Sequence, residues 1–377
     1  MKKICYIANM RSPHVRQWLE LLNSDVELSI ATIDTEIDFE GLELFDFKLG
    51  EVLCIPKFLR FIPQQLRYVI LGFLLRIQNY RFDLCHAHNA SGYGLSALLS
   101  GNKFLLTTYG SEIYNSATRS RLYNYILRKI LNRAELLTAS TPYMKTFLES
   151  HFPETEGKVK TFSLGVRNSF FCGPFERKKS KVKEGPVWFS SRRILPLYRT
   201  LEVTRAFKVY KKKGGKGSLV LLQGDASGEY FELIKREVLD CSDIRLVEGF
   251  VDTRTIIGLL DEADFIISVP ISDQLSSSIL EGMARQCVPI LSSLEAYAPI
   301  SNNVIFVRDQ PNYQSALEKI FEDTAKIDSQ ERQRLSIKCH RKIKVEFSKD
   351  KAQQFYCDII ESLTRIKRIP NSYKDQQ

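Results

Sequence analysis

The chain has 377 residues, of which 44% are hydrophobic and 26% are charged, a balance that is typical of folded proteins and excludes an intrinsically disordered chain. Its length predicts two domains, because single hydrophobic cores rarely grow so large. The formal net charge of +10 favours anionic partners, which leaves nucleic acid, an anionic membrane surface and phosphorylated substrates open.

Strands and helices alternate through the first half of the chain. Residues 1–7 are basic and then apolar, but the apolar part is short and lacks a small-residue cleavage site, so we interpret them as a first strand and not as a signal peptide. The expected strands are 3–9, 26–33, 84–88, 104–109, 135–140 and 159–164, and the expected helices are 15–22, 64–79, 93–99, 119–132 and 142–149. Apolar runs bounded by helical segments indicate a parallel sheet with both faces covered.

The alternation stops at a charged stretch, residues 177–186, which ends in Gly-Pro and which we interpret as a solvated linker. It then resumes with strands at 187–190, 218–223, 244–247, 265–269, 288–292 and 304–307, and helices at 202–212, 230–239, 253–261, 277–285 and 313–321. Residues 329–366 are expected to be wholly helical, and 371–377 to be frayed. The sequence therefore predicts an α/β fold of two doubly wound domains, with ligands at the carboxyl ends of the strands in a cleft between them.

Three broad features limit the class of protein. No apolar run approaches the roughly 18 residues that are needed to span a bilayer. The eight cysteines are scattered and form no Cys-x-x-Cys pair, which predicts reduced, mostly buried thiols in a cytoplasmic protein. No metal site is expected, structural zinc included.

The most informative segment is residues 268–284, where a strand ends and a helix begins. Asp273 lies in the connecting loop, and Ser276, Ser277 and Ser278 open the helix, so its first backbone N–H groups can form an anion site. Glu281 follows about one turn later, and its carboxylate can point back toward the helix start. Phosphates at the helix start and two acids for sugar hydroxyls would suit a nucleotide sugar. An ordinary capped helix with a solvated Asp273 is the alternative.

This segment resembles the motif of two acids, separated by seven residues, of glycosyltransferase family 4. The resemblance implies a GT-B fold, in which helices at the C-terminus return to the N-terminal domain. It implies that Glu281 binds the ribose hydroxyls and that Asp273, an acid near the reacting sugar, contacts the donor sugar. Asp273 departs from the usual glutamate, and residues 285–287 replace the usual small residues after the motif.

The family resemblance also sets the expected domains. We expect an N-terminal Rossmann-like acceptor domain at 1–170, a linker at 171–186, a nucleotide-sugar-binding Rossmann-like domain at 187–345, and a crossover helix with a tail at 346–377.

Further donor-binding residues follow the first strands of the second half. Arg192 and Arg193 come directly after strand 187–190 and resemble the family segment that contacts the donor diphosphate, a role that suits a guanidinium at a strand end. A surface basic loop is the alternative. Gly224 ends a strand in a turn, and Phe250 lies in a segment that resembles the loop beside the nucleotide base. Each of the last two would also suit a generic turn.

The first half contributes histidines and an acidic segment. His86 and His88 share one face of a strand; we expect His86 to be a core histidine, and the resemblance implies that His88 forms a hydrogen bond near the reacting centre. Ser111 and Glu112 resemble the family's Gly-Ser-Asp segment on the acceptor side. His14 matches a subgroup written Ser-x-His-x-x-x-Trp and is a further acceptor-side candidate, although a plain helix cap is as good an interpretation.

Basic and apolar residues mix in 55–81 and 119–133, which would suit contact with an anionic membrane. A core-facing helix with a solvated basic face is the alternative. The resemblance implies acceptors that are glycans or lipid-linked glycans, as in surface polysaccharide (lipopolysaccharide O-antigen or capsule) synthesis, at the inner face of the cytoplasmic membrane.

The function that we predict is retaining transfer of a sugar from a UDP- or GDP-sugar, with no cofactor. Retention follows from the resemblance alone. Two other functions remain open. A sugar-nucleotide epimerase of the same fold would interconvert donors without an acceptor. A basic nucleic-acid-binding protein would fit the charge, but we find no zinc-finger, RNP-like or helix-turn-helix signature, so no nucleic-acid partner is expected.

Overall fold

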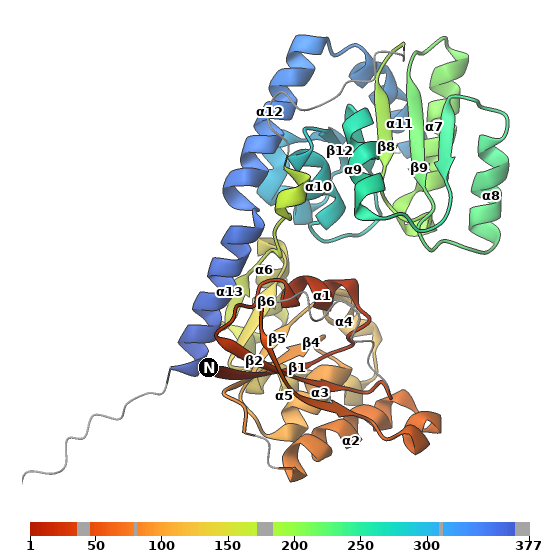
Figure 1. The fold of residues 1–377 in the computed structure, drawn as a ribbon. Helices are drawn as coiled ribbons and strands as arrows, with labels where there is room; N and C mark the ends of the chain where they lie inside the picture. The colour runs from red at the N-terminus through yellow and green to blue at the C-terminus, as the bar shows by residue number, and fades with distance from the viewer. Residues whose placement is uncertain (36–45, 79–80, 172–183, 309–311, 366–377) are drawn as a thin grey trace, which may run out of the picture. The chain divides into compact units, whose positions relative to one another are not determined.

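The computed structural model describes residues 1–35, 46–78, 81–171, 184–308 and 312–365. It divides into two compact units: the first comprises Met1–Leu164 together with the chain from Ala352 onward, and the second comprises Gly165–Lys351. Figure 1 shows the two units and the terminal helix that belongs mainly to the first. Most of the expected linker, residues 171–186, and the expected frayed tail lie outside the described residues.

The first unit is built on a seven-stranded parallel sheet in the order β3-β2-β1-β4-β5-β6-β7. Its strands are β1 (Lys2–Ile7), β2 (Val26–Thr32), β3 (Lys48–Cys54), β4 (Leu84–His88), β5 (Phe104–Thr107), β6 (Leu136–Ala139) and β7 (Val159–Thr161). Its helices are α1 (Pro13–Leu19), α2 (Gln64–Ile77), α3 (Gly92–Ser100), α4 (Ser111–Tyr114), α5 (Arg121–Arg133), α6 (Pro142–His151) and α13 (Lys349–Thr364), with a 3-10 segment η2 (Lys57–Phe61).

Both faces of this sheet are buried, which explains its continuous apolar strands. In β1, Cys5 and Ile7 pack into a core with residues of α2, α3, α5 and α6. Ile4 and Tyr6 alternate to the other face and pack with residues of α1 and α13. The terminal helix therefore closes the second face of the first unit.

The second unit holds a six-stranded parallel sheet in the order β10-β9-β8-β11-β12-β13. The strands are β8 (Val187–Ser190), β9 (Ser218–Leu222), β10 (Ile244–Val247), β11 (Phe265–Ser268), β12 (Val288–Ser292) and β13 (Ile305–Val307). The helices are α7 (Thr200–Lys212), α8 (Glu229–Val238), α9 (Thr253–Glu262), α10 (Ser277–Ala284), α11 (Tyr313–Ala325) and α12 (Ser329–Glu346), with 3-10 segments η6 (Pro196–Tyr198) and η7 (Glu295–Asn303).

The same alternation builds the core of the second unit. Trp188 and Phe265 face one side of the sheet, where the Trp188 indole N–H donates to the Thr324 hydroxyl over 3.0 Å. Phe189 and Ile266 face the other side and pack with residues of α10. Both sheets are thus covered on both faces, as the apolar runs predict.

An edge strand and a break between the last two helices are among the features that were not predicted. Strand β3 was not predicted, because it is an edge strand whose side chains are mostly exposed or half-buried and give no apolar run. The stretch 329–366, which was expected to be wholly helical, forms two helices with a short break between them: α12 ends at Glu346 and α13 begins at Lys349. At this break the Val166 N–H donates to the Phe347 carbonyl over 2.7 Å, and the Lys349 N–H donates to the Val166 carbonyl over 3.0 Å. These bonds satisfy backbone groups that a continuous helix would pair internally.

Among the helices that the structure describes, none combines the length and the apolar character that crossing a bilayer requires.

Candidate functional site

Each sheet has one point where the strand order reverses: between β1 and β4 in the first unit, and between β8 and β11 in the second. Loops that leave neighbouring strands at such a point run to opposite faces and leave a crevice, which is the usual ligand site in these folds. In the second unit Arg192 follows β8, and Asp273 and Ser276 follow β11. The predicted donor residues therefore flank the reversal point.

Arg192 and Asp273 form a largely buried ion pair. The Arg192 Nη2 lies 3.1 Å from the Asp273 Oδ2, and their side chains are only 12% and 14% exposed. The Tyr297 hydroxyl donates to the same carboxylate oxygen over 2.9 Å, and the Arg192 guanidinium lies 4.2 Å from the centre of the Tyr198 ring. Burial raises the pKa of Asp273, while Arg192 and Tyr297 oppose the shift. Arg192 and Tyr297 thus hold Asp273 in place. The alternative interpretation, a capped helix with a solvated Asp273, does not fit these contacts.

Ser276 is the N-cap residue of α10, but its hydroxyl does not cap the helix. It accepts a hydrogen bond from Arg192 and lies 3.0 Å from the Ser278 hydroxyl. The Ser276 hydroxyl therefore bonds to Arg192 of the ion pair and does not form the helix cap that had been expected. Because the first N–H groups of a helix have no partner inside it, the start of α10 keeps donors that an anion can use.

Glu281 lies one turn into α10, and its carboxylate forms no hydrogen bond with the described residues. Burial raises the pKa of Glu281 to about 7, and the positive charge of Arg167 opposes this shift. Arg167 itself donates to the Thr253 hydroxyl over 3.4 Å. A largely buried acid with open hydrogen-bonding capacity is suited to accept hydroxyl groups from a ligand.

The other predicted donor residues lie at the ends of β8, β9 and β10. Arg193 pairs with Asp225 over 3.0 Å, but the two side chains are 49% and 68% exposed. Gly224 has a φ of +65°, a left-handed conformation that favours glycine. The Phe250 side chain is 91% exposed. The structure thus brings Arg192, Asp273, Ser276 and Ser278 together, whereas Arg193 pairs with Asp225 and Phe250 is exposed.

In the first unit His86 and His88 lie side by side, with ring centres 4.1 Å apart. His86 is a core histidine, as expected, because its ring nitrogens lie 2.7 Å from the hydroxyls of Tyr356 and Thr107. The His88 Nδ1 lies 2.9 Å from the Tyr109 hydroxyl, and its buried Nε2 has no partner among the described residues. Burial lowers the pKa of His88 to about 3. His88 is therefore neutral near pH 7 and has one ring nitrogen to offer.

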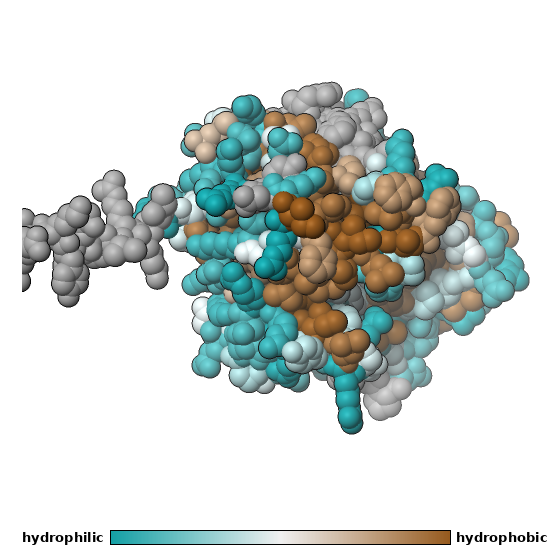
Figure 2. Space-filling view, turned by 90° about the horizontal axis from the view of Figure 1, so that it is seen from below, coloured by the Kyte–Doolittle hydropathy of each residue, from teal (hydrophilic) through white to brown (hydrophobic). Residues whose placement is uncertain are grey.

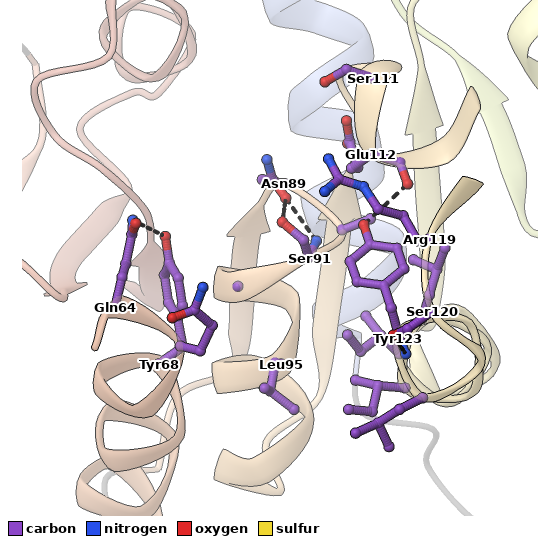
Figure 3. A pocket seen from close by; sticks show the side chains of 17 residues that line it. Gln64, Tyr68, Asn89, Ser91, Leu95, Ser111, Glu112, Arg119, Ser120 and Tyr123 are labelled. Atoms are coloured by element: carbon purple, nitrogen blue, oxygen red, sulfur yellow. Dashed lines mark hydrogen bonds between the residues drawn. The ribbon is translucent and has the colours of Figure 1, made fainter. Parts of the chain in front are cut away.

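The three predicted acceptor-side residues separate into two places. His14 lies in the first turn of α1, with its ring 5.6 Å from the Tyr109 ring, and burial lowers the pKa of His14. Ser111 and Glu112 line a cavity of about 630 Å³ in the first unit (Figure 3). The Glu112 Oε1 accepts from the Tyr109 N–H over 2.7 Å, and burial raises the pKa of the carboxyl.

Several residues that hold the predicted ones were missed. Tyr297, Tyr198 and Tyr109 each contact a predicted residue, but none of them was predicted as a site residue. Arg167, whose positive charge opposes the rise in the pKa of Glu281, was not predicted as a site residue either. Within the described ranges, no group of three or more His, Cys, Asp or Glu side chains could hold a metal ion.

Residues 3–141 match the family described as Glycosyl transferase 4-like. No curated protein sequence matches the chain significantly. Several solved structures are similar over nearly the whole chain. A glycosyltransferase from Rickettsia africae ESF-5 has 18% identity and a TM-score of 0.74, with 97% of this chain and 99% of that chain covered. HepE of Anabaena, in complex with UDP, has 15% identity and a TM-score of 0.75, with 96% and 100% covered. A UDP-forming α,α-trehalose-phosphate synthase from Burkholderia xenovorans has 12% identity and a TM-score of 0.72, with 97% and 100% covered.

At such identities the solved structures establish the fold, while the family match concerns the first unit. Together they confirm the predicted GT-B architecture of two Rossmann-like domains and the predicted resemblance to glycosyltransferases. The match of residues 3–141 supports the predicted enzyme class, a transferase, and the solved structures support the fold.

Proposed function

We propose that this GT-B glycosyltransferase moves a sugar from a UDP- or GDP-sugar to a glycan or lipid-linked glycan acceptor, in the synthesis of a surface polysaccharide such as lipopolysaccharide O-antigen or capsule. The observation that carries the proposal is the cluster of Arg192, Asp273 and Ser276 at the start of α10, with Glu281 one turn away. Anabaena HepE has been solved with UDP and with UDP-glucose, which makes UDP-sugars the first donors to test.

In the proposed mechanism each residue has a role that matches its environment. Arg192 and the N–H groups at the start of α10 stabilise the leaving diphosphate. Glu281 accepts the ribose hydroxyls, and Asp273 orients the donor sugar. His88, which is neutral because burial lowers its pKa to about 3, forms a hydrogen bond to the reacting sugar and does not supply a positive charge. Arg193, Gly224, Phe250, Ser277 and Ser278 would border the nucleotide.

Retention of the anomeric configuration is the part of the proposal that rests on the family resemblance alone. NMR coupling constants of the anomeric proton, measured in donor and product, distinguish retention from inversion. A product of inverted configuration would contradict retention, but it would not contradict the proposed donor site.

The donor site is tested by a thermal-shift panel of nucleotide sugars on the wild type and on Glu281→Ala. We expect one nucleotide series to raise the Tm, because a ligand at about 100 times its Kd stabilises the bound protein by about 2.7 kcal/mol. The shift should be absent in Glu281→Ala. It should persist in Glu229→Ala, a control that removes an exposed glutamate from α8 of the same unit. A well-folded protein that no nucleotide stabilises would contradict the proposal.

We further propose that the protein rests on the inner face of the cytoplasmic membrane. Seen from below, it presents an apolar area on the first unit (Figure 2). The strongly exposed apolar residues of η2, α2 and α5 are Phe58, Phe61, Leu66, Phe73, Ile77, Leu122 and Tyr125, which we call the apolar face. The same elements carry exposed basic residues, among them Arg60 and Arg121. Exposed aromatic and basic side chains on one face suit an anionic bilayer.

Flotation with anionic liposomes tests this location. The wild type should float with the liposomes at low salt and dissociate as salt screens the basic residues. The double variant Phe58→Ser, Phe61→Ser should remain in the lower fractions, because it removes two of the most exposed apolar side chains. Leu239→Ser serves as the control, since Leu239 is 82% exposed but lies in the second unit. If the wild type does not float with the liposomes at low salt, the proposed membrane location is wrong.

A further inference from the structure

The contact between His88 and Tyr109 lies where two neighbouring strands of the first unit end. His88 is the last residue of β4, and Tyr109 lies just beyond the end of β5. The strands pair with His88 opposite Thr107, and the Asn89 N–H donates to the Thr107 carbonyl over 3.0 Å, which extends the pairing past His88. The Tyr109 N–H donates to the Glu112 carboxylate over 2.7 Å. Hydrogen bonds therefore fix the backbone on both sides of the contact.

The His88 ring packs against a second imidazole whose own hydrogen bonds are complete. The ring centres of His86 and His88 are 4.1 Å apart, and their planes are tilted by 31°. The two ring nitrogens of His86 each lie 2.7 Å from a hydroxyl group, one of Tyr356 and one of Thr107. Burial lowers the pKa of both histidines, so both are neutral near pH 7. His86 thus holds the plane of the His88 ring but does not decide where the His88 proton lies.

A neutral histidine carries its proton on one ring nitrogen, and the hydrogen bonds of the ring decide which one. The Nδ1 of His88 lies 2.9 Å from the Tyr109 hydroxyl, and the Nε2 is buried without a partner among the described residues. There are two possible arrangements. Either the phenol donates to Nδ1 and the His88 proton lies on Nε2, or Nδ1 carries the proton and donates to the phenol oxygen.

The surroundings of the Tyr109 hydroxyl favour the first arrangement. Burial and the charge of Glu112 raise the pKa of Tyr109, whereas a hydrogen bond from the Trp18 side chain lowers it. The indole N–H can only donate, so the phenol oxygen accepts from Trp18 and keeps its own hydrogen for another group. Among the described residues that hydrogen has no acceptor other than His88. If Nδ1 donated instead, the phenol hydrogen would be left without a partner in a partly buried place, which is unfavourable.

We infer that Tyr109 is a positioning residue, whose hydroxyl donates to the Nδ1 of His88 and so holds the histidine proton on Nε2. The inference rests on the proposed function, in which His88 contacts the reacting sugar, and it specifies the kind of contact. His88 offers the sugar a hydrogen-bond donor, so its partner there is an oxygen atom that accepts. It does not act as a base, because its unprotonated nitrogen is already bound to Tyr109.

Nitrogen-15 NMR of the imidazole side chains, recorded on the full chain at neutral pH without ligand, tests the inference directly. Protonated and unprotonated ring nitrogens of a neutral histidine have well-separated chemical shifts. The spectrum of His88→Gln identifies the His88 signals among those of the five histidines. We expect the shift of a protonated nitrogen for Nε2 and of an unprotonated nitrogen for Nδ1. The opposite pattern would overturn the inference.

The matched variants are Tyr109→Phe and Tyr93→Phe. Each removes one phenol hydroxyl from the first unit and keeps the ring, but the Tyr93 hydroxyl lies 3.3 Å from the hydroxyl of Thr32 and is not a partner of His88. Tyr109→Phe should convert His88 to a mixture of its two neutral forms, with intermediate shifts for both ring nitrogens. Tyr93→Phe should keep the wild-type pattern. Equal changes in the two variants, or no change in Tyr109→Phe, would show that Tyr109 does not place the proton.

Calorimetric titration with UDP and with UDP-glucose connects the proton position to the proposed function. Because only UDP-glucose carries a sugar, Tyr109→Phe should weaken its binding about fivefold relative to that of UDP, as expected for one impaired hydrogen bond. Tyr93→Phe should leave the ratio of the two affinities unchanged. An unchanged ratio in Tyr109→Phe would mean a merely structural role and would overturn the inference. If the wild type binds UDP-glucose but its NMR pattern is the opposite one, only the inference is wrong. If the wild type binds neither compound, the proposed UDP-sugar donor is wrong, and the NMR pattern still decides whether Tyr109 places the proton.

Discussion

Replacing Arg192 with alanine is expected to lower the free energy of unfolding of the second unit by about 3–5 kcal/mol and to abolish nucleotide-sugar binding. The Asp273 side chain is only 14% exposed, and the variant removes its ion-pair partner. It also removes the donor of the hydrogen bond to Ser276 and the proposed phosphate ligand. Guanidinium denaturation, followed by tryptophan fluorescence, measures the change in the free energy of unfolding. A Trp18→Phe background leaves Trp188, in the second unit, as the one remaining tryptophan, so the signal reports on that unit.

Arg193→Ala is the matched control for this variant. Arg193 is adjacent in sequence and also forms an ion pair, but its pair with Asp225 is 49% and 68% exposed. Exposed pairs contribute about 0–1 kcal/mol, so the control should lose little stability. Adding Asp273→Asn to Arg192→Ala should recover part of the loss, because it removes the buried charge. Similar losses for Arg192→Ala and Arg193→Ala would show that the buried pair has no special role.

The Glu281 carboxyl should give stability and donor binding opposite dependences on pH. Burial raises the pKa of Glu281 to about 7 from its ordinary value of 4.5. Between these values the folded protein holds a proton that the unfolded chain releases, so stability falls as the pH rises from about 4.5 to 7, by up to about 3 kcal/mol. UDP-glucose affinity should instead rise through pH 7, because the ribose hydroxyls donate better to the ionised carboxylate.

Glu281→Gln separates this group from the others that titrate. The amide has no charge to bury, so the Glu281 contribution to the fall in stability should disappear, and the rise in UDP-glucose affinity should become flat. The remaining affinity should be about tenfold lower, since a neutral acceptor replaces a charged one. Chemical denaturation and calorimetric titration at a series of pH values measure both effects. An unchanged pH dependence in the variant would assign the titration to another group.

The fold could be predicted because most strands are buried on both faces and give short apolar runs, as in β4 and β11. Strand β3 at the sheet edge gives no such run, and its seven residues were missed. The break between α12 and α13 was also missed, because it depends on backbone bonds to Val166, far away in the sequence.

The candidate site was predicted in part for the same physical reason. The motif residues Arg192, Asp273 and Glu281 follow strand ends, and parallel strands bring such ends to one edge of a sheet. Their partners do not follow this rule. Tyr297 reaches Asp273 from η7, and Arg167 influences Glu281 from the segment before β8. Neither position is set by a local pattern, so only the folded chain reveals them.

The terminal helix also determines the order in which the protein can be completed on the ribosome. The Tyr356 hydroxyl lies 2.8 Å from the Tyr6 hydroxyl and 2.7 Å from His86, deep in the first unit. The first unit therefore lacks a wall of its core until nearly the whole chain has been synthesised, whereas residues 165–351 of the second unit precede most of α13. The half of the protein that is translated first is the half whose folding is finished last, and in the meantime its uncovered apolar sheet face depends on the translation machinery or on chaperones for protection.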